Sequence, residues 1–187
     1  MDSRFTRLWT ASTISNLGDG VVFAAFPLIV ASLTRDPIAV SVLAFSLRLP
    51  WLLFALPSGV IVDRNDRRRL MISADLVRAT ALGILAIALA TGVPSLFVLY
   101  AVGFGVGMAE TIFDSAAEAF LPAIVDGETL NKANGRLVSA RWVANSFIGP
   151  PLGALLFVAA VSLPVAVDAV TFLVAALLIA TIGGTFS

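Results

Sequence analysis

The sequence contains no cysteine and no histidine, and only 13% of its 187 residues are charged. Without these side chains the chain cannot form disulfides, thiolate nucleophiles, imidazole bases or the common zinc and haem ligand sets. Any proton transfer must therefore use carboxylates, and we expect neither a metal site nor a cofactor. A soluble domain usually carries about a quarter charged residues, so the shortage of charge also argues against a water-soluble fold.

Hydrophobic residues make up 59% of the chain, which is more apolar surface than one soluble core can hide. A helix needs roughly 20 apolar residues to cross a bilayer. We predict an all-α integral membrane protein in which residues 1–187 form one bundle of six transmembrane helices. The predicted spans are Leu8 to Leu33, Ile38 to Val62, Leu70 to Ala90, Val93 to Phe113, Leu137 to Val161 and Leu163 to Ile182.

Basic residues gather in alternate loops, on the side of the N-terminus. Arg35 alone lies on the other side. The positive-inside rule therefore predicts that both termini are cytoplasmic. The basic residues on the predicted cytoplasmic side are Arg4, Arg7, Arg64, Arg67, Arg68, Arg69, Lys132 and Arg136.

Two charged residues fall near the middle of predicted spans, where each costs at least about 2.5 kcal/mol unless it is paired or hydrated. Asp19 lies about eleven residues into the first span, roughly 16 Å deep, and Arg48 is similarly deep in the second. One interpretation is a structural ion pair between Asp19 and Arg48. The other is that both face a central cavity, where Asp19 is a protonation site or a cation contact. Asn16, one turn before Asp19, shares its helix face.

Further charges occupy the ends of spans. Glu110, Asp114 and Glu118 are spaced by four on the fourth span, and we expect Glu110 to line a pathway or bind an arginine. Asp75 and Arg78 are spaced as an intrahelical ion pair near the inner surface. Asp168 is expected to be structural, and Arg141 is shallow enough to reach the interface.

Glycines in the fourth and fifth spans have the spacing of close helix packing. They do not form a phosphate-binding loop, because no G-x-x-x-x-G-K-[ST] sequence is present. No nucleotide-driven motor and no nucleic-acid partner are expected. The scattered carboxylates and the absence of H-E-x-x-H make an intramembrane enzyme a weak hypothesis.

The loop after the second span reads Gly59-Val-Ile-Val-Asp63-Arg64-Asn65-Asp66-Arg67-Arg68-Arg69. It resembles the G-x-x-x-D-R-x-G-R-R motif of the major facilitator superfamily, with Asp66 in place of the usual glycine. Gly149-Pro150-Pro151-Leu152-Gly153-Ala154 resembles the G-P-x-x-G-G motif of drug and proton antiporters, with Ala154 in place of the last glycine. With Ser15 to Asp19, Ala74 to Arg78, and Asp168 to Leu173, the chain is similar to the bacterial enterobactin and macrolide exporters of that superfamily.

The resemblance implies one of two six-helix bundles around a cavity, each bundle built from two inverted three-helix repeats. It places Asn16, Asp19, Arg48 and Glu110 beside the substrate and proton pathway. The loop motif implies a cytoplasmic gate formed by Gly59, Asp63, Arg64, Arg67 and Arg68, with Asp114 as an acidic partner. The fifth-span motif is Gly149, Pro150 and Gly153, where proline removes backbone donors and bends the helix.

The expected function is secondary transport across the bacterial plasma membrane, most simply proton-coupled efflux of an amphipathic drug or siderophore. Members of the superfamily normally have a second six-helix bundle, and we expect it to be absent from this chain and supplied by a longer product, a second copy or another chain. The alternatives are a membrane scaffold or subunit that does not transport, and a truncated fragment without function.

Overall fold

The computed structural model describes residues 3–184, and long helices make up nearly all of this range. Six helical segments are long and apolar enough to cross a membrane. The elements are α1 (Ser3–Leu33), α2 (Pro37–Asp63), α3 (Arg67–Ala90), α4 (Leu96–Ile124), α5 (Gly127–Trp142), the π-helix η1 (Val143–Ile148), α6 (Gly149–Ala159) and α7 (Leu163–Ala180). The prediction of an all-helical bundle with six spans is confirmed.

Short polar loops with capping residues separate the spans. The Asp36 side chain accepts a hydrogen bond from the backbone of Ile38 and starts α2. Asp66 accepts one from the backbone of Arg69 and starts α3. Gly92, with a φ of 71°, makes the turn before α4, a conformation that glycine adopts without strain.

Two helices extend beyond the predicted spans. Helix α4 continues past Phe113, the predicted end of the fourth span, as far as Ile124, and α5 begins at Gly127, before the predicted start of the fifth span at Leu137. Both stretches contain charged residues, which suggested loops, yet they also bury Phe120, Leu121 and Ala133. Helices therefore continue past the apolar region, and the fifth span consists of α5, η1 and α6 in series.

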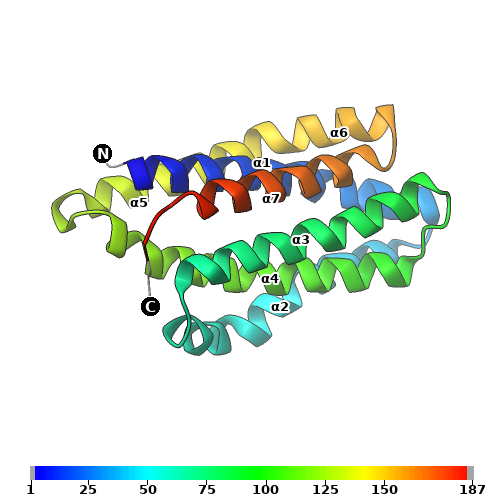
Figure 1. Ribbon diagram of the computed structural model, residues 1–187. Coiled ribbons are helices and arrows are strands. Elements are labelled where there is room, and N and C mark those ends of the chain that lie inside the picture. Colours follow the sequence, from blue (N-terminus) through cyan, green and yellow to red (C-terminus); the bar gives the residue numbers. More distant parts are fainter. Residues whose placement is uncertain (1–2, 185–187) are drawn as a thin grey trace.

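The helices pack as a row of neighbours that runs from α2 through α4, α3, α7 and α1 to the fifth span. Figure 1 shows the long helices side by side, with the N- and C-terminal ends at the same end of the bundle. Helices α1 and α4 make few contacts with one another. Helix α2 and the fifth span, at the two ends of the row, are the least buried segments.

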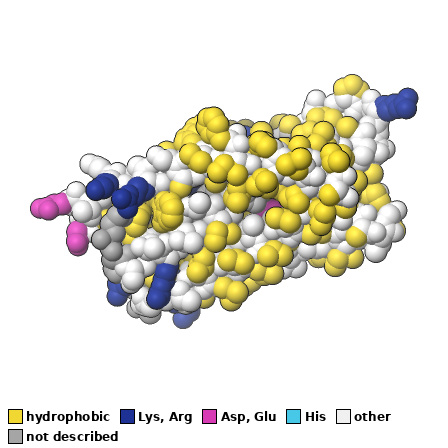
Figure 2. Space-filling view, turned by 90° about the horizontal axis from the view of Figure 1, so that it is seen from above, with side chains coloured by type: hydrophobic (Ala, Val, Ile, Leu, Met, Phe, Trp, Pro, Cys, Tyr) yellow, Lys and Arg dark blue, Asp and Glu magenta, His cyan; other side chains and the backbone are white. Residues whose placement is uncertain are grey.

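On the face shown in Figure 2, hydrophobic side chains cover most of the middle, and Lys and Arg side chains lie mainly toward its two ends. The exposed apolar residues include Trp51, Leu56, Phe97 and Val158, each more than 60% exposed. In a lipid environment such side chains are solvated by the bilayer. The surface is therefore that of a membrane protein.

Candidate functional site

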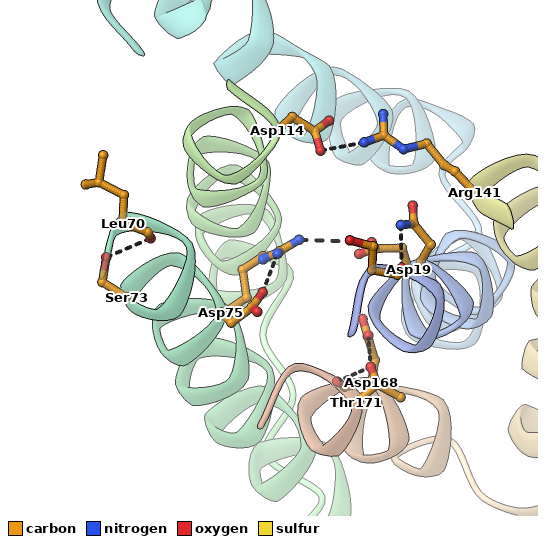
Figure 3. A network of polar contacts seen from close by, with 11 residues as sticks. Asp19, Leu70, Ser73, Asp75, Asp114, Arg141, Asp168 and Thr171 are labelled. Carbon is orange, nitrogen blue, oxygen red and sulfur yellow. Dashed lines mark hydrogen bonds and ion pairs between the residues drawn. The ribbon is translucent and has the colours of Figure 1, made fainter. Parts of the chain in front are cut away.

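The centre of the bundle is occupied by the guanidinium of Arg78 on α3, a side chain that is only 1% exposed. Its Nη2 donates to Oδ1 of Asp75 at 2.5 Å, and its Nη1 lies 4.0 Å from Oδ2 of Asp19 on α1. Of the two interpretations of Asp19, the structural ion pair with Arg48 is contradicted, because the cation beside Asp19 is Arg78. Figure 3 shows Asp75 and Asp19 on neighbouring helices, with dashed lines for the ion pair that each of them forms with Arg78.

Two aromatic rings hold the same guanidinium. Its central carbon lies 4.0 Å from the ring centroid of Phe172 on α7 and 4.7 Å from that of Phe113 on α4. A cation over an aromatic face gains about 2 kcal/mol or more when the contact is desolvated. Arg78 therefore connects four helices, through Asp19 on α1, Asp75 on its own helix, and the two rings.

Asp168 lies nearby on α7 and is 1% exposed. It accepts a hydrogen bond at 3.0 Å from the hydroxyl of Thr171. A Cβ added to Gly18 would lie only 2.0 Å from the Asp168 carboxylate, so glycine at this position lets α1 and α7 approach. The sequence predicts Asp168 near the end of its span. In the structure its side chain is buried beside Gly18, the residue that precedes Asp19.

A second, more exposed ion pair joins α4 to α5. Nη2 of Arg141 donates to Oδ1 of Asp114 at 2.8 Å, and the two side chains are 46% and 35% exposed. Glu110 lies one turn from Asp114, and the charges that act on its carboxylate include Asp114, Arg78, Arg141 and Arg48. That Glu110 and Arg48 line a pathway stays a prediction.

The side chain of Asn16 forms a hydrogen bond within its own helix. Its side-chain amide donates to the carbonyl of Ser12 at 2.6 Å, within its own helix. The expectation that Asn16 shares a helix face with Asp19 is compatible with this bond, and its role in a pathway stays a prediction.

A groove of about 1010 Å³ opens between the first half of α1 and the fifth span. Phe5, Trp9 and Leu17 line one wall, and the other wall is formed by residues of α5 and η1. The indole nitrogen of Trp9 donates to the carbonyl of Arg136 across the groove at 3.3 Å. The groove is a candidate binding surface. It ends near Leu17, and because residues two apart on a helix do not share a face, Asp19 is not part of its lining.

Beyond the groove, α1 and the fifth span are in backbone contact. A Cβ on Gly149 would lie 2.6 Å from the backbone of Gly20, and a Cβ on Gly153 would lie 2.2 Å from the carbonyl oxygen of Val21. The fifth-span motif therefore acts as a packing surface for α1. The π-helix η1 lies directly before Gly149 and Pro150, and such segments are often found at functional sites.

The acidic residue implied as a partner of the loop motif has a different partner. Asp114 binds Arg141 on α5. Arg68 donates from Nε to the carbonyl of Ile179 at 3.1 Å and from Nη2 to that of Ala180. Arg7 donates to the carbonyl of Thr181. These carbonyls lie at the C-terminal end of α7, where helices lack internal donors. A Cβ on Gly59 would meet no atom within 4 Å.

Residues 1–183 match the family described as transmembrane secretion effector. The chain belongs to this family. The transmembrane secretion effectors are part of the major facilitator superfamily, as the motifs indicated. The family consists of transporters and not of enzymes. With six helices long and apolar enough to cross a membrane, this chain is a multi-pass membrane protein.

Three relatives with which this chain shares sequence similarity are efflux proteins. Macrolide efflux protein A of Streptococcus pyogenes is 26% identical over 154 residues, which cover 82% of this chain and 38% of that relative. Macrolide efflux protein A of Enterococcus faecalis is 31% identical over 120 residues, covering 64% and 36%. Multidrug efflux pump Tap of Mycolicibacterium fortuitum is 30% identical over 154 residues, covering 78% and 37%. The chain thus spans less than two fifths of the length of these relatives.

Arg78 is deeper in the bundle than the sequence predicted. Starting the third span at Leu70 placed Arg78 near the inner surface, whereas α3 begins at Arg67 and Arg78 lies eleven residues further, roughly 16 Å along the helix. A stretch without charged residues follows Arg78 to the end of α3. That stretch was the available signal that its side chain cannot easily reach water.

Proposed function

We propose that this chain forms one six-helix bundle of a proton-coupled efflux transporter for amphipathic small molecules, drugs such as macrolides first among them. The observation that carries the proposal is Asp19, a carboxylate in the middle of a membrane bundle, 16% exposed and 4.0 Å from Arg78. A carboxylate in that environment can exist with or without its proton, because the neighbouring cation stabilises the charged form and burial stabilises the neutral one.

The groove beside α1 supplies the binding surface that such a transporter needs. It is lined by aromatic and aliphatic residues, with hydroxyl groups from Thr6, Thr13 and Ser139. A small-molecule site usually combines apolar walls with a few polar groups. We place substrate binding in this groove, with Asn16, Arg48 and Glu110 further along the pathway.

The proposal includes the topology and the missing partner. Both termini are placed in the cytoplasm of a bacterial cell, which is supported by the basic loops and by the position of both ends at one end of the bundle (Figure 1). The open side between α2 and the fifth span, where α1 and α4 make few contacts, is where a second bundle or a second copy would close the cavity. Reporter fusions at the loop with Arg35 and at the N-terminus test the orientation.

We further assign the segment with Gly59, Asp63, Arg64, Arg67 and Arg68 to a gate at the cytoplasmic end. Its support is the resemblance of the motif and the bonds of Arg68 to the end of α7. These bonds link the segment between α2 and α3 to the last span of the bundle.

The test of the function uses the complete reading frame that contains residues 1–187, expressed in bacteria that lack their own efflux pumps. Cells are assayed for accumulation of radiolabelled erythromycin and for resistance to a panel of amphipathic drugs, with and without a proton uncoupler. We expect export that the uncoupler abolishes and that Asp19→Asn removes. Asp36→Asn is the matched control, because Asp36 lies on an exposed loop and asparagine also caps helices.

The outcomes separate the hypotheses. If the wild-type protein exports no drug of the panel although it is present in the membrane, the efflux function is wrong and a scaffold that binds a partner becomes the better explanation. If export occurs but Asp19→Asn exports as well as the wild type, the assignment of the proton site to Asp19 is wrong.

A further inference from the structure

Arg78 has two carboxylate neighbours that are held very differently. Asp75 is 0% exposed and 2.5 Å from Nη2, whereas Asp19 is 16% exposed and 4.0 Å from Nη1. The two contacts use different nitrogens of one guanidinium. The cation can therefore keep its bond to Asp75 whether or not Asp19 is charged.

The surroundings fix the position of the guanidinium. Arginine stays protonated at any physiological pH, and Phe113 and Phe172 approach it within 4.7 Å and 4.0 Å. An uncompensated charge at this depth would be strongly unfavourable, and Asp75 supplies the compensation from one helical turn away. Asp75 Oδ2 and Arg78 Nε are buried without a hydrogen-bond partner among the described residues, so the pair is held mainly by one short ion pair and by the rings.

From this geometry we infer that Arg78 is a positioning residue, a fixed counter-ion that stabilises the ionised carboxylate of Asp19, and that Asp75 anchors Arg78 throughout the cycle. The inference rests on the proposed proton site at Asp19. When Asp19 releases its proton to water, the carboxylic acid becomes a carboxylate and gains the attraction of Arg78. When it binds a proton again, Asp75 alone neutralises the guanidinium, and neither Arg78 nor Asp75 changes protonation.

Other charges face this centre and must be considered with it. Asp168 on α7 acts on Asp19, and Glu110 and Asp114 on α4 act on both Asp19 and Arg78. All three are acidic and oppose ionisation of Asp19. Arg78 is the cation with a contact to Asp19 among the described residues, which is why its loss should move the pH at which Asp19 ionises.

The experiment measures protons released when erythromycin binds to the purified full-length protein, as a function of pH, in weakly buffered solution with a pH-sensitive dye. The informative variant is Asp75→Asn combined with Arg78→Gln. Removing both partners of a buried pair can be nearly neutral for folding, whereas removing one leaves the other uncompensated. The double variant should therefore fold, and its thermal unfolding is recorded alongside. Arg78→Lys retains the positive charge, and Arg35→Gln controls for the loss of an exposed arginine.

For the double variant we expect the midpoint of proton release to rise by about 1 to 3 pH units, the effect of an opposite charge within 4–6 Å. Arg78→Lys should stay close to the wild-type midpoint, and Arg35→Gln should match it. A double variant that folds and keeps the wild-type midpoint would overturn the inference. So would an Arg78→Lys midpoint that moves as far as that of the double variant.

Asp19→Asn separates this inference from the function beneath it. If Asp19→Asn releases protons like the wild type, or if the wild type releases none, the proposed proton site itself is wrong. If Asp19→Asn abolishes proton release and the double variant keeps the wild-type midpoint, only the role of Arg78 is wrong.

Discussion

The backbone contact between α1 and α6 makes Gly153 the position where a single methyl group should be most informative. A Cβ at Gly153 would lie 2.2 Å from the carbonyl oxygen of Val21, and ordinary van der Waals contact begins near 3.4 Å. The helices would have to separate locally by about 1.2 Å, the difference between these two distances. The obstacle is backbone, so no flexible side chain can rotate away.

The expected cost follows from two opposing effects. Overpacking a well-packed contact costs about 1 to 3 kcal/mol, and replacing glycine by alanine inside a helix gains about 0.5 to 1 kcal/mol. Gly153→Ala should therefore destabilise the protein by a net amount of about 0 to 2.5 kcal/mol. Gly83→Ala on α3 is the matched control, because a Cβ there meets no atom within 4 Å, and it should show the gain alone.

The assay is reversible unfolding in mixed micelles with increasing sodium dodecyl sulfate, followed by tryptophan fluorescence. The difference between the two alanine variants isolates the steric term, about 1 to 3 kcal/mol. If Gly153→Ala is as stable as Gly83→Ala, the close approach of α1 and α6 is not a feature of the folded protein, and the role assigned to the fifth-span motif is wrong.

Three further predictions concern the ends of helices and one buried contact. Asp66→Ala should cost about 1 kcal/mol and Asp66→Gly only a few tenths, because Asp66 caps α3 and glycine is tolerated at a cap; equal losses in the same unfolding assay would contradict this. Arg68→Gln should speed amide hydrogen exchange in the last turn of α7 by about 5- to 150-fold, since its two bonds to the α7 carbonyls are together worth about 1 to 3 kcal/mol, whereas Arg69→Gln should leave that exchange unchanged. Ser58→Ala should cost about 1 kcal/mol, because the Ser58 hydroxyl, fully buried in α2, is 2.8 Å from that of Ser115 on α4; unchanged unfolding would show that the two hydroxyls do not bond.

Much of the candidate site was visible in the sequence as isolated charges. Asp19, Arg48 and Glu110 stood out because a charge inside an apolar span is costly. The sequence did not show that the partner of Asp19 is Arg78. Asp19 could be placed by depth along its helix, but the direction of its side chain depends on the rotation of α1. That rotation is set by contacts such as those of Gly18 with Asp168 and Thr171 on α7.

The same limit applies to Asp114, Arg141 and Arg68. Both arginines lie near helix ends, where long side chains can reach several acceptors. The resemblance of the loop motif implied Asp114 as its acidic partner. The structure shows instead that α5 continues as a helix beside α4, so Arg141 is the cation within reach, and the loop arginine Arg68 finds the carbonyls of α7.

The sequence by itself determined the membrane class, the number of spans and the family, since these depend on the length of apolar runs, the spacing of loops and short motifs. Such properties are local, and they are the same whatever the helices touch. Only the tertiary structure decided that Arg78 is the partner of Asp19, that Asp168 lies against α1, and that glycines join α1 to the fifth span. Those facts depend on how each helix is turned about its axis and on which neighbour it meets, and a rotation of one residue, 100° on a helix, would change all of them.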